Sequence, residues 1–278
     1  MQKLEPHDVG AGSVAVLGIP WDEKSSFLRG AAEAPTRIRQ VLHNGSSNMA
    51  PESGVDLSLD ARLCDVGDLQ VEGEGAVDAI DGAIAALAQR GARPLVLGGD
   101  HAVTYPIVRS LARIHPPLTL LHLDAHPDLY DEFAGDRLSH ACPFARIMEE
   151  GAARRLVQLG IRTLNPHQRA QAERFGVEVI AMRDWEDGVR PSLAAPLYLS
   201  IDLDAFDPAY APGVSHHEPG GLTVREVVRL IQDLPVAPIG ADIVELNPRR
   251  DTHDRTAMLA VKLLKEIAGR MLAAPDAG

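Results

Sequence analysis

Short apolar runs alternate with amphipathic stretches along most of this 278-residue chain. In the stretch 75–90, Ile80 and Ile84 belong to a set of apolar residues at helical spacing. Residues 117–123, in contrast, form a continuous apolar run of strand length. Such alternation is typical of a mostly parallel sheet with helices on both faces. We expect strands at residues 13–19, 63–66, 94–97, 117–123, 156–161, 177–181, 196–201 and 239–244, and helices at 36–43, 75–90, 103–114, 139–150, 166–175, 223–234 and 256–272.

Polar side chains follow the ends of four of these expected strands. The carboxyl ends of parallel strands meet at one edge of a sheet, and ligands of open α/β sheets bind there. Alternation in an extended chain also places residues two apart on one side, which brings together the polar residues after strand 117–123. The residues expected at this edge are His101, Asp124, His126, Asp128, Asp202, Asp204 and Glu245.

The first six of these residues form a plausible set of metal ligands. Converging carboxylates are costly to bury unless a cation neutralises them. Four carboxylates and two neutral imidazoles would be balanced by two divalent cations, which could share a water and lower its pKa toward neutrality. Oxygen and nitrogen ligands without sulfur favour Mn²⁺, with Ni²⁺, Co²⁺, Fe²⁺ and Zn²⁺ as alternatives. The simpler reading of Asp124 to Asp128 is a polar turn, since short Asp-x-His patterns arise by chance.

Composition argues against several classes of function. The net charge of −12 disfavours nucleic acid and anionic membranes as partners. No apolar run approaches the length of a membrane span, and the first residues lack the apolar core of a signal peptide. Cys64 and Cys142 are too few for a disulfide framework or a thiolate metal site. Without a repeat, a low-complexity tract or a linker, we expect one domain over residues 1–278, located in the cytoplasm.

Three motifs resemble those of the ureohydrolase (arginase/agmatinase) family. They are residues 98–101 (Gly-Gly-Asp-His), 124–128 (Asp-Ala-His-Pro-Asp) and 200–208 (Ser-Ile-Asp-Leu-Asp-Ala-Phe-Asp-Pro). Stretches that look like the plant-type arginase branch are 25–28, 65–68, 139–149, 211–216 and 218–222. The resemblance implies a three-layer α/β/α sandwich, usually assembled into homotrimers or homohexamers. It also implies hydrolysis of a guanidinium group, carried by a small cationic substrate, to urea and an amine.

The resemblance assigns roles to individual residues. His101, Asp124, Asp128 and Asp202 match the ligands of one manganese ion. Asp124, His126, Asp202 and Asp204 match the ligands of the other, so that Asp124 and Asp202 bridge the two ions. Glu245 matches the glutamate that binds the guanidinium group, and a planar carboxylate can hold that group through two hydrogen bonds. His140 matches the histidine proposed to protonate the leaving amine, which suits an imidazole near neutral pH.

The residues expected to bind the part of the substrate beyond the guanidinium group differ from those of animal-type arginases. Animal-type arginases hold the amino-acid carboxylate with an Asn after the aspartate-rich motif, whereas here Asp128 is followed by Leu129 and Tyr130. The plant-type branch shares this departure. We expect Arg29 and His216 to contact the substrate, which we expect to be L-arginine, narrowly ahead of agmatine and then of other guanidino acids.

Two further classes stay open. One is a ureohydrolase-like binding or regulatory subunit without turnover. The presence of all six ligand residues together with His140 and Glu245 argues against it, since a degenerate homologue is expected to lose at least one of them. The other is a related deacetylase with one zinc ion, which needs fewer ligands than this sequence provides.

Overall fold

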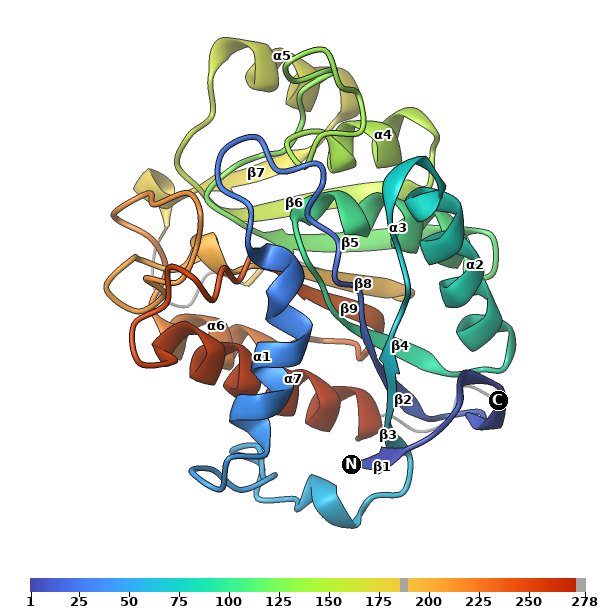
Figure 1. Cartoon of the computed structure of the whole chain (residues 1–278). Coiled ribbons are helices and arrows are strands. Elements are labelled where there is room, and N and C mark those ends of the chain that lie inside the picture. Colours follow the sequence, from blue (N-terminus) through green and yellow to red (C-terminus); the bar gives the residue numbers. More distant parts are fainter. Residues whose placement is uncertain (186–189, 274–278) are drawn as a thin grey trace.

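One parallel sheet of nine strands forms the centre of the described structure, a computed structural model that covers residues 1–185 and 190–273 (Figure 1). Neighbouring strands follow the order β1-β3-β2-β4-β9-β8-β5-β6-β7. The strands are β1 (Gln2–Lys3), β2 (Val14–Gly18), β3 (Leu63–Asp68), β4 (Arg93–Leu97), β5 (Leu118–Leu123), β6 (Ala153–Ile161), β7 (Glu178–Ala181), β8 (Leu197–Asp202) and β9 (Pro238–Val244).

Helices cover both faces of this sheet. The α-helices are α1 (Ala34–Leu42), α2 (Ala76–Gln89), α3 (Thr104–Ala112), α4 (Pro143–Glu149), α5 (Pro166–Phe175), α6 (Val224–Gln232) and α7 (Arg255–Leu272). Helices α1, α6 and α7 lie on one face, whereas α2, α3 and α4 lie on the other (Figure 1). The expected three-layer α/β/α sandwich with a parallel sheet is therefore confirmed.

The period of two along each strand divides the core between the two faces. Val14 and Val16 of β2 pack in the core under α1 and α7, while Ala15 and Leu17 pack in the core under α2 and α3. All four side chains are almost fully buried. Burial on both faces explains why the strands read as continuous apolar runs rather than as alternating ones.

Among the strands and α-helices, two differ clearly from the sequence-based expectation, whereas the others agree with it to within three residues at each end. The helix expected from residue 139 begins at Pro143, because residues 139–142 form a turn and proline favours the first position of a helix. Strand β1 was not expected, since two residues are too few to show a period. The predicted domain of residues 1–278 includes 186–189 and 274–278, which lie outside the described residues.

Four adjacent strands position the candidate site. Strands β4, β9, β8 and β5 are neighbours in the sheet, and their carboxyl ends carry the polar residues singled out above. Gly99, just after β4, has no room for a side chain, since an added Cβ would lie 1.9 Å from the carbonyl oxygen of Trp21. Its own carbonyl accepts a hydrogen bond from the Glu245 main-chain N–H at 2.9 Å. This hydrogen bond holds the loop after β4 against the end of β9.

Within residues 1–185 and 190–273, no helix combines the length and the apolar character needed to cross a membrane.

Candidate metal centre and active site

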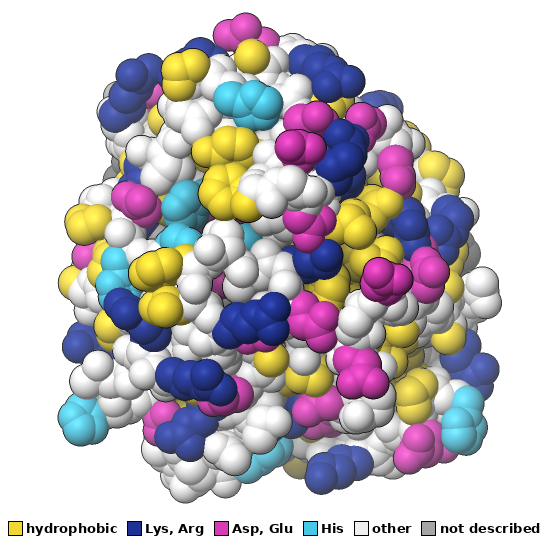
Figure 2. All heavy atoms as spheres, turned by 45° about the horizontal axis from the view of Figure 1, so that its top comes forward, with side chains coloured by type: hydrophobic (Ala, Val, Ile, Leu, Met, Phe, Trp, Pro, Cys, Tyr) yellow, Lys and Arg dark blue, Asp and Glu magenta, His cyan; other side chains and the backbone are white. Residues whose placement is uncertain are grey.

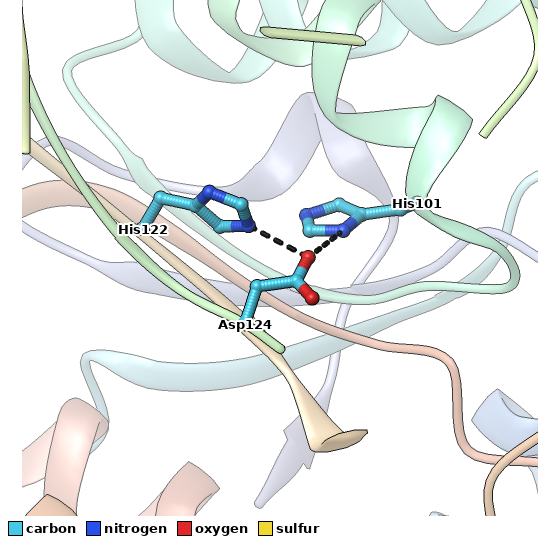
Figure 3. Close-up of side chains that lie close together, drawn as sticks. All are labelled: His101, His122 and Asp124. Atoms are coloured by element: carbon cyan, nitrogen blue, oxygen red, sulfur yellow. Dashed lines mark hydrogen bonds and ion pairs between the residues drawn. The ribbon is translucent and has the colours of Figure 1, made fainter. Parts of the chain in front are cut away.

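Asp124 lies at the centre of the candidate metal site. It follows β5 directly, and its carboxylate is fully buried. Its Oδ2 lies 3.1 Å from Nδ1 of His101 (Figure 3), and its Oδ1 lies 3.3 Å from Nδ1 of His126. The two oxygens of one carboxylate therefore face two different groups of ligand atoms, which is the geometry of a bridging ligand.

The first group surrounds the His101 ring. Oδ2 of Asp128 lies 3.1 Å from Nδ1 of His101, and Oδ2 of Asp202 lies 3.2 Å from it. With Asp124, three carboxylates thus approach one ring nitrogen. Nδ1 is buried and makes no hydrogen bond within the described residues. Buried polar atoms without a hydrogen-bond partner are rare in proteins. A ring nitrogen that faces several carboxylates and makes no hydrogen bond is what we expect of a metal ligand.

The second group contains His126, Asp124 and Asp204. Nδ1 of His126 lies 3.0 Å from Oδ2 of Asp204. Burial, with the negative charge of Asp124, raises the pKa of Asp204 to about 7, and burial with the neighbouring charges of Asp204 and Asp124 raises the pKa of Asp202. These carboxyl groups resist ionisation unless a cation neutralises them. The residues of both groups therefore fit a pair of divalent cations in charge and in donor type.

His122 joins the first group, although the sequence-based interpretation did not include it. Its Nε2 lies 2.9 Å from the same Asp124 oxygen that faces His101 (Figure 3). The Gln158 amide donates from Nε2 to the Pro127 carbonyl and lies 3.0 Å from Nδ1 of His122, so Nδ1 accepts and Nε2–H donates to Asp124. His122 therefore orients the bridging carboxylate. It continues the alternation of residues 124, 126 and 128 one step back into β5, and this was the signal available in the sequence.

A buried hydrogen-bond chain fixes the other side of the His101 ring. Nε2 of His101 lies 2.9 Å from the Ser200 hydroxyl, which donates to Asp242 at 2.7 Å. Thr104 and Tyr198 donate to the second oxygen of Asp242. Such outer hydrogen bonds hold a ligand ring in one orientation.

Glu245 and His140 lie beside the ligand groups. Oε1 of Glu245 accepts from the His101 main-chain N–H at 3.0 Å and lies 2.8 Å from Nδ1 of His140. Nε2 of His140 faces Ser26, whose main-chain N–H lies at 3.1 Å and whose hydroxyl lies at 2.7 Å. A neutral ring can accept from the Ser26 N–H, and a protonated ring can donate to the Ser26 hydroxyl. Ser26 thus offers a partner to both states of His140.

Backbone conformation also marks the site. Asp128 and Glu245 have positive φ angles of 50° and 65°. These angles lie in the left-handed region of backbone conformation, which residues other than glycine rarely adopt. Each such residue costs on the order of 1–3 kcal/mol and persists where surrounding contacts hold it. Strain of this kind clusters at functional sites.

A cavity of about 190 Å³ opens onto these residues. Figure 2 shows histidine side chains gathered beside hydrophobic ones around a hollow on the face viewed there. The lining residues are Ser26, His126, Asp128, Tyr130, Phe133, His140, Ala141, Thr163, Gln168, Asp202, Asp204, His216, Glu218 and Glu245.

The expected substrate contacts separate into two cases. His216 lines the cavity, with its ring centre 5.5 Å from that of His140. Arg29 is exposed, donates to the Glu23 carbonyl at 3.2 Å and does not line the cavity. The structure therefore brings His216 to the site and leaves Arg29 outside it. His217 is also outside, since it is exposed and faces the Pro212 carbonyl.

Titration of His140 tests its contact with Glu245. Burial lowers the pKa of His140, but the charge and hydrogen bond of Glu245, together with the charges of Asp100 and Asp128, outweigh burial and raise it to about 9. The ring is then protonated at pH 7 and loses its proton as the pH rises through about 9. In Glu245→Gln, burial remains while the largest of the contributions that oppose it is lost, so the pKa of His140 should fall below its wild-type value. Histidine NMR of the metal-free protein measures both values.

His115 serves as an internal control for this titration. Burial alone lowers its pKa, and no contact with Glu245 contributes. Its titration should be the same in both proteins. An unchanged His140 curve in Glu245→Gln would contradict the assigned contact.

The fold and the site together define a class of protein, the α/β/α sandwich proteins with a buried cluster of carboxylates and histidines that could hold metal ions at the carboxyl edge of a parallel sheet. The chain belongs to the arginase family, whose family model matches residues 12–269. It is a hydrolase of that family, as expected from its motifs.

Individual relatives support this assignment over nearly the whole chain. "Arginase 1, mitochondrial" of Arabidopsis thaliana is 46% identical, over 93% of this chain and 81% of the relative. "Arginase 2, chloroplastic/mitochondrial" of the same plant is 43% identical, over 93% and 80%. The solved structure of the arginase from Medicago truncatula has a TM-score of 0.86 at 41% identity and covers 95% of this chain and 88% of its own. The expected resemblance to the plant-type branch is therefore confirmed.

The expectation of a cytoplasmic location is wrong by this comparison. The two Arabidopsis relatives are named mitochondrial and chloroplastic or mitochondrial. The expectation rested only on the absence of apolar segments and of a disulfide framework, which does not discriminate between the cytoplasm and an organelle.

Proposed function

We propose that this protein hydrolyses L-arginine to L-ornithine and urea, using two divalent cations, preferably Mn²⁺. The observation that carries the proposal is the Asp124 carboxylate, whose two oxygens face two separate groups of ligand atoms next to Glu245. The proposed ligands of one ion are His101, Asp124, Asp128 and Asp202, and those of the other are Asp124, His126, Asp202 and Asp204. Bound ions would supply Lewis-acid chemistry and activate water at neutral pH.

Glu245 provides the contact for the guanidinium group. Its Oε1 is engaged by His101 and His140, whereas no residue in the described ranges donates to its Oε2. The side chain is buried yet lines the cavity. A carboxylate in this position attracts a guanidinium cation and fixes the plane of the group, which orients its carbon for attack.

His140 provides the proton for the leaving amine. Its ring lines the cavity, and Glu245 holds the proton on Nδ1. Nε2, which faces Ser26, can carry a second proton, because the charge and hydrogen bond of Glu245 favour the protonated ring. The Ser26 hydroxyl accepts a hydrogen bond from this N–H and so fixes the orientation of the ring until the proton is transferred to the departing nitrogen.

Agmatine, the decarboxylated analogue of arginine, is the second candidate substrate. No Lys or Arg is among the described residues that line the cavity, so no lysine or arginine side chain awaits the carboxylate of arginine there. Other guanidino acids form a third class.

Urea release from parallel incubations tests the proposal. The Mn²⁺-loaded protein is assayed with L-arginine, agmatine and 4-guanidinobutanoate, and Asp128→Ala provides the inactive control. We expect the highest kcat/KM for L-arginine and no urea from the control. A higher kcat/KM for agmatine would replace the proposed substrate and keep the chemistry. No urea from any guanidino compound would overturn both.

We also propose that residues 1–278 form one domain and that the protein assembles as a homotrimer or homohexamer. The family model, which covers residues 12–269, supports the single domain. Light scattering coupled to size-exclusion chromatography tests the assembly.

A further inference from the structure

Arginine and agmatine differ only in the α-carboxylate, and the described site holds no obvious partner for that group. The Asn of animal-type arginases is absent, because Leu129 and Tyr130 follow Asp128. The cavity lining includes no Lys or Arg. Glu218, the half-exposed carboxylate of the lining, lies 4.0 Å from Nε2 of His126 and offers no donor. Neutral donors of the lining are therefore candidates for binding the carboxylate.

Gln168 supplies one such donor. Its side chain is only 3% exposed, lines the cavity, and accepts a hydrogen bond at Oε1 from the Leu129 main-chain N–H at 3.1 Å. A main-chain N–H can only donate, so this contact fixes which end of the amide is oxygen. The Nε2 group therefore points away from Leu129, and no residue in the described ranges accepts from it. An amide donor that is held in one orientation, lines a cavity and has no acceptor in the described ranges is well placed to donate to a ligand in that cavity.

Tyr130 supplies a second donor by a similar argument. Its hydroxyl accepts from Nδ2 of Asn165 at 2.6 Å. The direction of that bond is fixed, because Oδ1 of Asn165 already accepts from the Gln168 main-chain N–H at 2.9 Å. The Tyr130 hydroxyl proton is therefore free to donate, and Tyr130 lines the same cavity. Stacking on His167 holds its ring in place.

The start of α5 connects the two donors. Asn165 caps this helix, Pro166 occupies its first position, and Gln168 is its third residue. Main-chain dipoles at a helix start favour a negative group nearby. Leu129, which binds the Gln168 side chain, directly follows the proposed metal ligand Asp128. The two donors are thus fixed, through hydrogen bonds and the chain itself, to the residue that faces His101.

We propose that Nε2 of Gln168 and the hydroxyl of Tyr130 bind the α-carboxylate of the substrate, so that the site selects guanidino acids over decarboxylated guanidino amines. This inference rests on the proposed ureohydrolase function and names the residues that decide its substrate class. Neutral donors suffice, since hydrogen bonds to a charged group are about twice as strong as neutral ones.

Gln168→Glu is the most direct variant. Its carboxylate can still accept from the Leu129 N–H, but it replaces the free donor with a charged oxygen that repels a carboxylate. Tyr130→Phe removes only the hydroxyl. Gln171→Glu is the matched control, because Gln171 lies one turn further along α5, is also buried and does not line the cavity.

The experiment measures two ratios on the Mn²⁺-loaded proteins. One is kcat/KM for L-arginine over that for agmatine, and the other is the affinity for L-ornithine over that for putrescine, by calorimetry. Losing a hydrogen bond to a charged group should lower both ratios about 10- to 100-fold in Gln168→Glu. Tyr130→Phe also loses a hydrogen bond to the charged carboxylate but adds no repelling charge, so it should lower both ratios about 10-fold. Gln171→Glu should leave both ratios unchanged.

The outcomes separate the two proposals. Wild-type protein that releases no urea from any guanidino compound defeats the proposed function, while the ratio of ornithine to putrescine affinity still tests the carboxylate site. Unchanged ratios in Gln168→Glu and Tyr130→Phe, in active protein, overturn this inference alone. If Gln168→Glu loses metal, the substitution has disturbed Asp128 through its neighbour Leu129, and its ratios do not count. The ratios of Tyr130→Phe then decide whether the carboxylate binds at this site.

Discussion

Asp124→Asn is expected to lose both metal ions and to release urea more than roughly 10³-fold more slowly, well beyond the 10- to 100-fold effect typical of residues that only orient a ligand. Asp124 is the residue whose two oxygens face both ligand groups. The amide keeps the shape of the side chain but replaces one charged oxygen with an NH₂ group, which cannot bind a cation. One ion then loses a ligand, and the other keeps a neutral amide oxygen in place of a charged carboxylate oxygen.

Metal content and urea release, measured on the same samples, test this prediction. Asp131→Asn is the control, because Asp131 lies three residues beyond Asp128 but its side chain binds Arg137 and Arg146. The control should keep its metal and activity. His122→Gln, which disturbs only the orientation of Asp124, should lower metal affinity by about 10- to 100-fold. Full metal content in Asp124→Asn would show that Asp124 does not bridge two ions.

Glu245→Gln is expected to lower kcat/KM for L-arginine by about 10²- to 10³-fold, the usual range for removing one partner of a buried ion pair. The amide oxygen can still accept from the His101 N–H, so the loop after β4 should keep its position. The guanidinium group loses its charged partner, and His140 loses the charge that raises its pKa. Binding and proton donation should therefore both weaken.

Metal content distinguishes the effect of Glu245→Gln from that of Asp124→Asn. Glu245 belongs to neither ligand group, so Glu245→Gln should still bind both ions. A matched control is Glu226→Gln, because Glu226 caps α6 and does not line the cavity. A Glu245→Gln protein that keeps kcat/KM within about threefold of the wild type would remove Glu245 from the substrate site.

The edge of the sheet could be predicted from the sequence because the proposed ligands lie at or just after the ends of strands. A buried strand of a parallel sheet is visible as an apolar run, and the residue after it must lie at the carboxyl edge. This reasoning located Asp124, Asp202 and Glu245 without any side-chain geometry. It did not reveal which oxygen faces which ring, since that depends on the backbone after each strand, such as the positive φ of Asp128.

Contacts between distant segments could not be predicted in the same way. Ser26 and His140 are 114 residues apart, and only the folded structure shows that they touch. Gln168 lies on a helix that was predicted with its observed bounds. The orientation of its side-chain amide, however, depends on a hydrogen bond from Leu129, which lies in a distant loop. Arg29 was expected at the pocket from its position in the plant-type pattern, but its side chain turns to Glu23 at the surface.

Stepwise addition of Mn²⁺ to metal-free protein, with urea release from L-arginine measured at each step, tests the binuclear arginine-hydrolysing site most directly. The proposed site predicts that activity rises until about two equivalents of metal per chain are bound and then stays constant. Activity that is complete at one equivalent, or that needs no added metal, would contradict a site built on the two oxygens of Asp124.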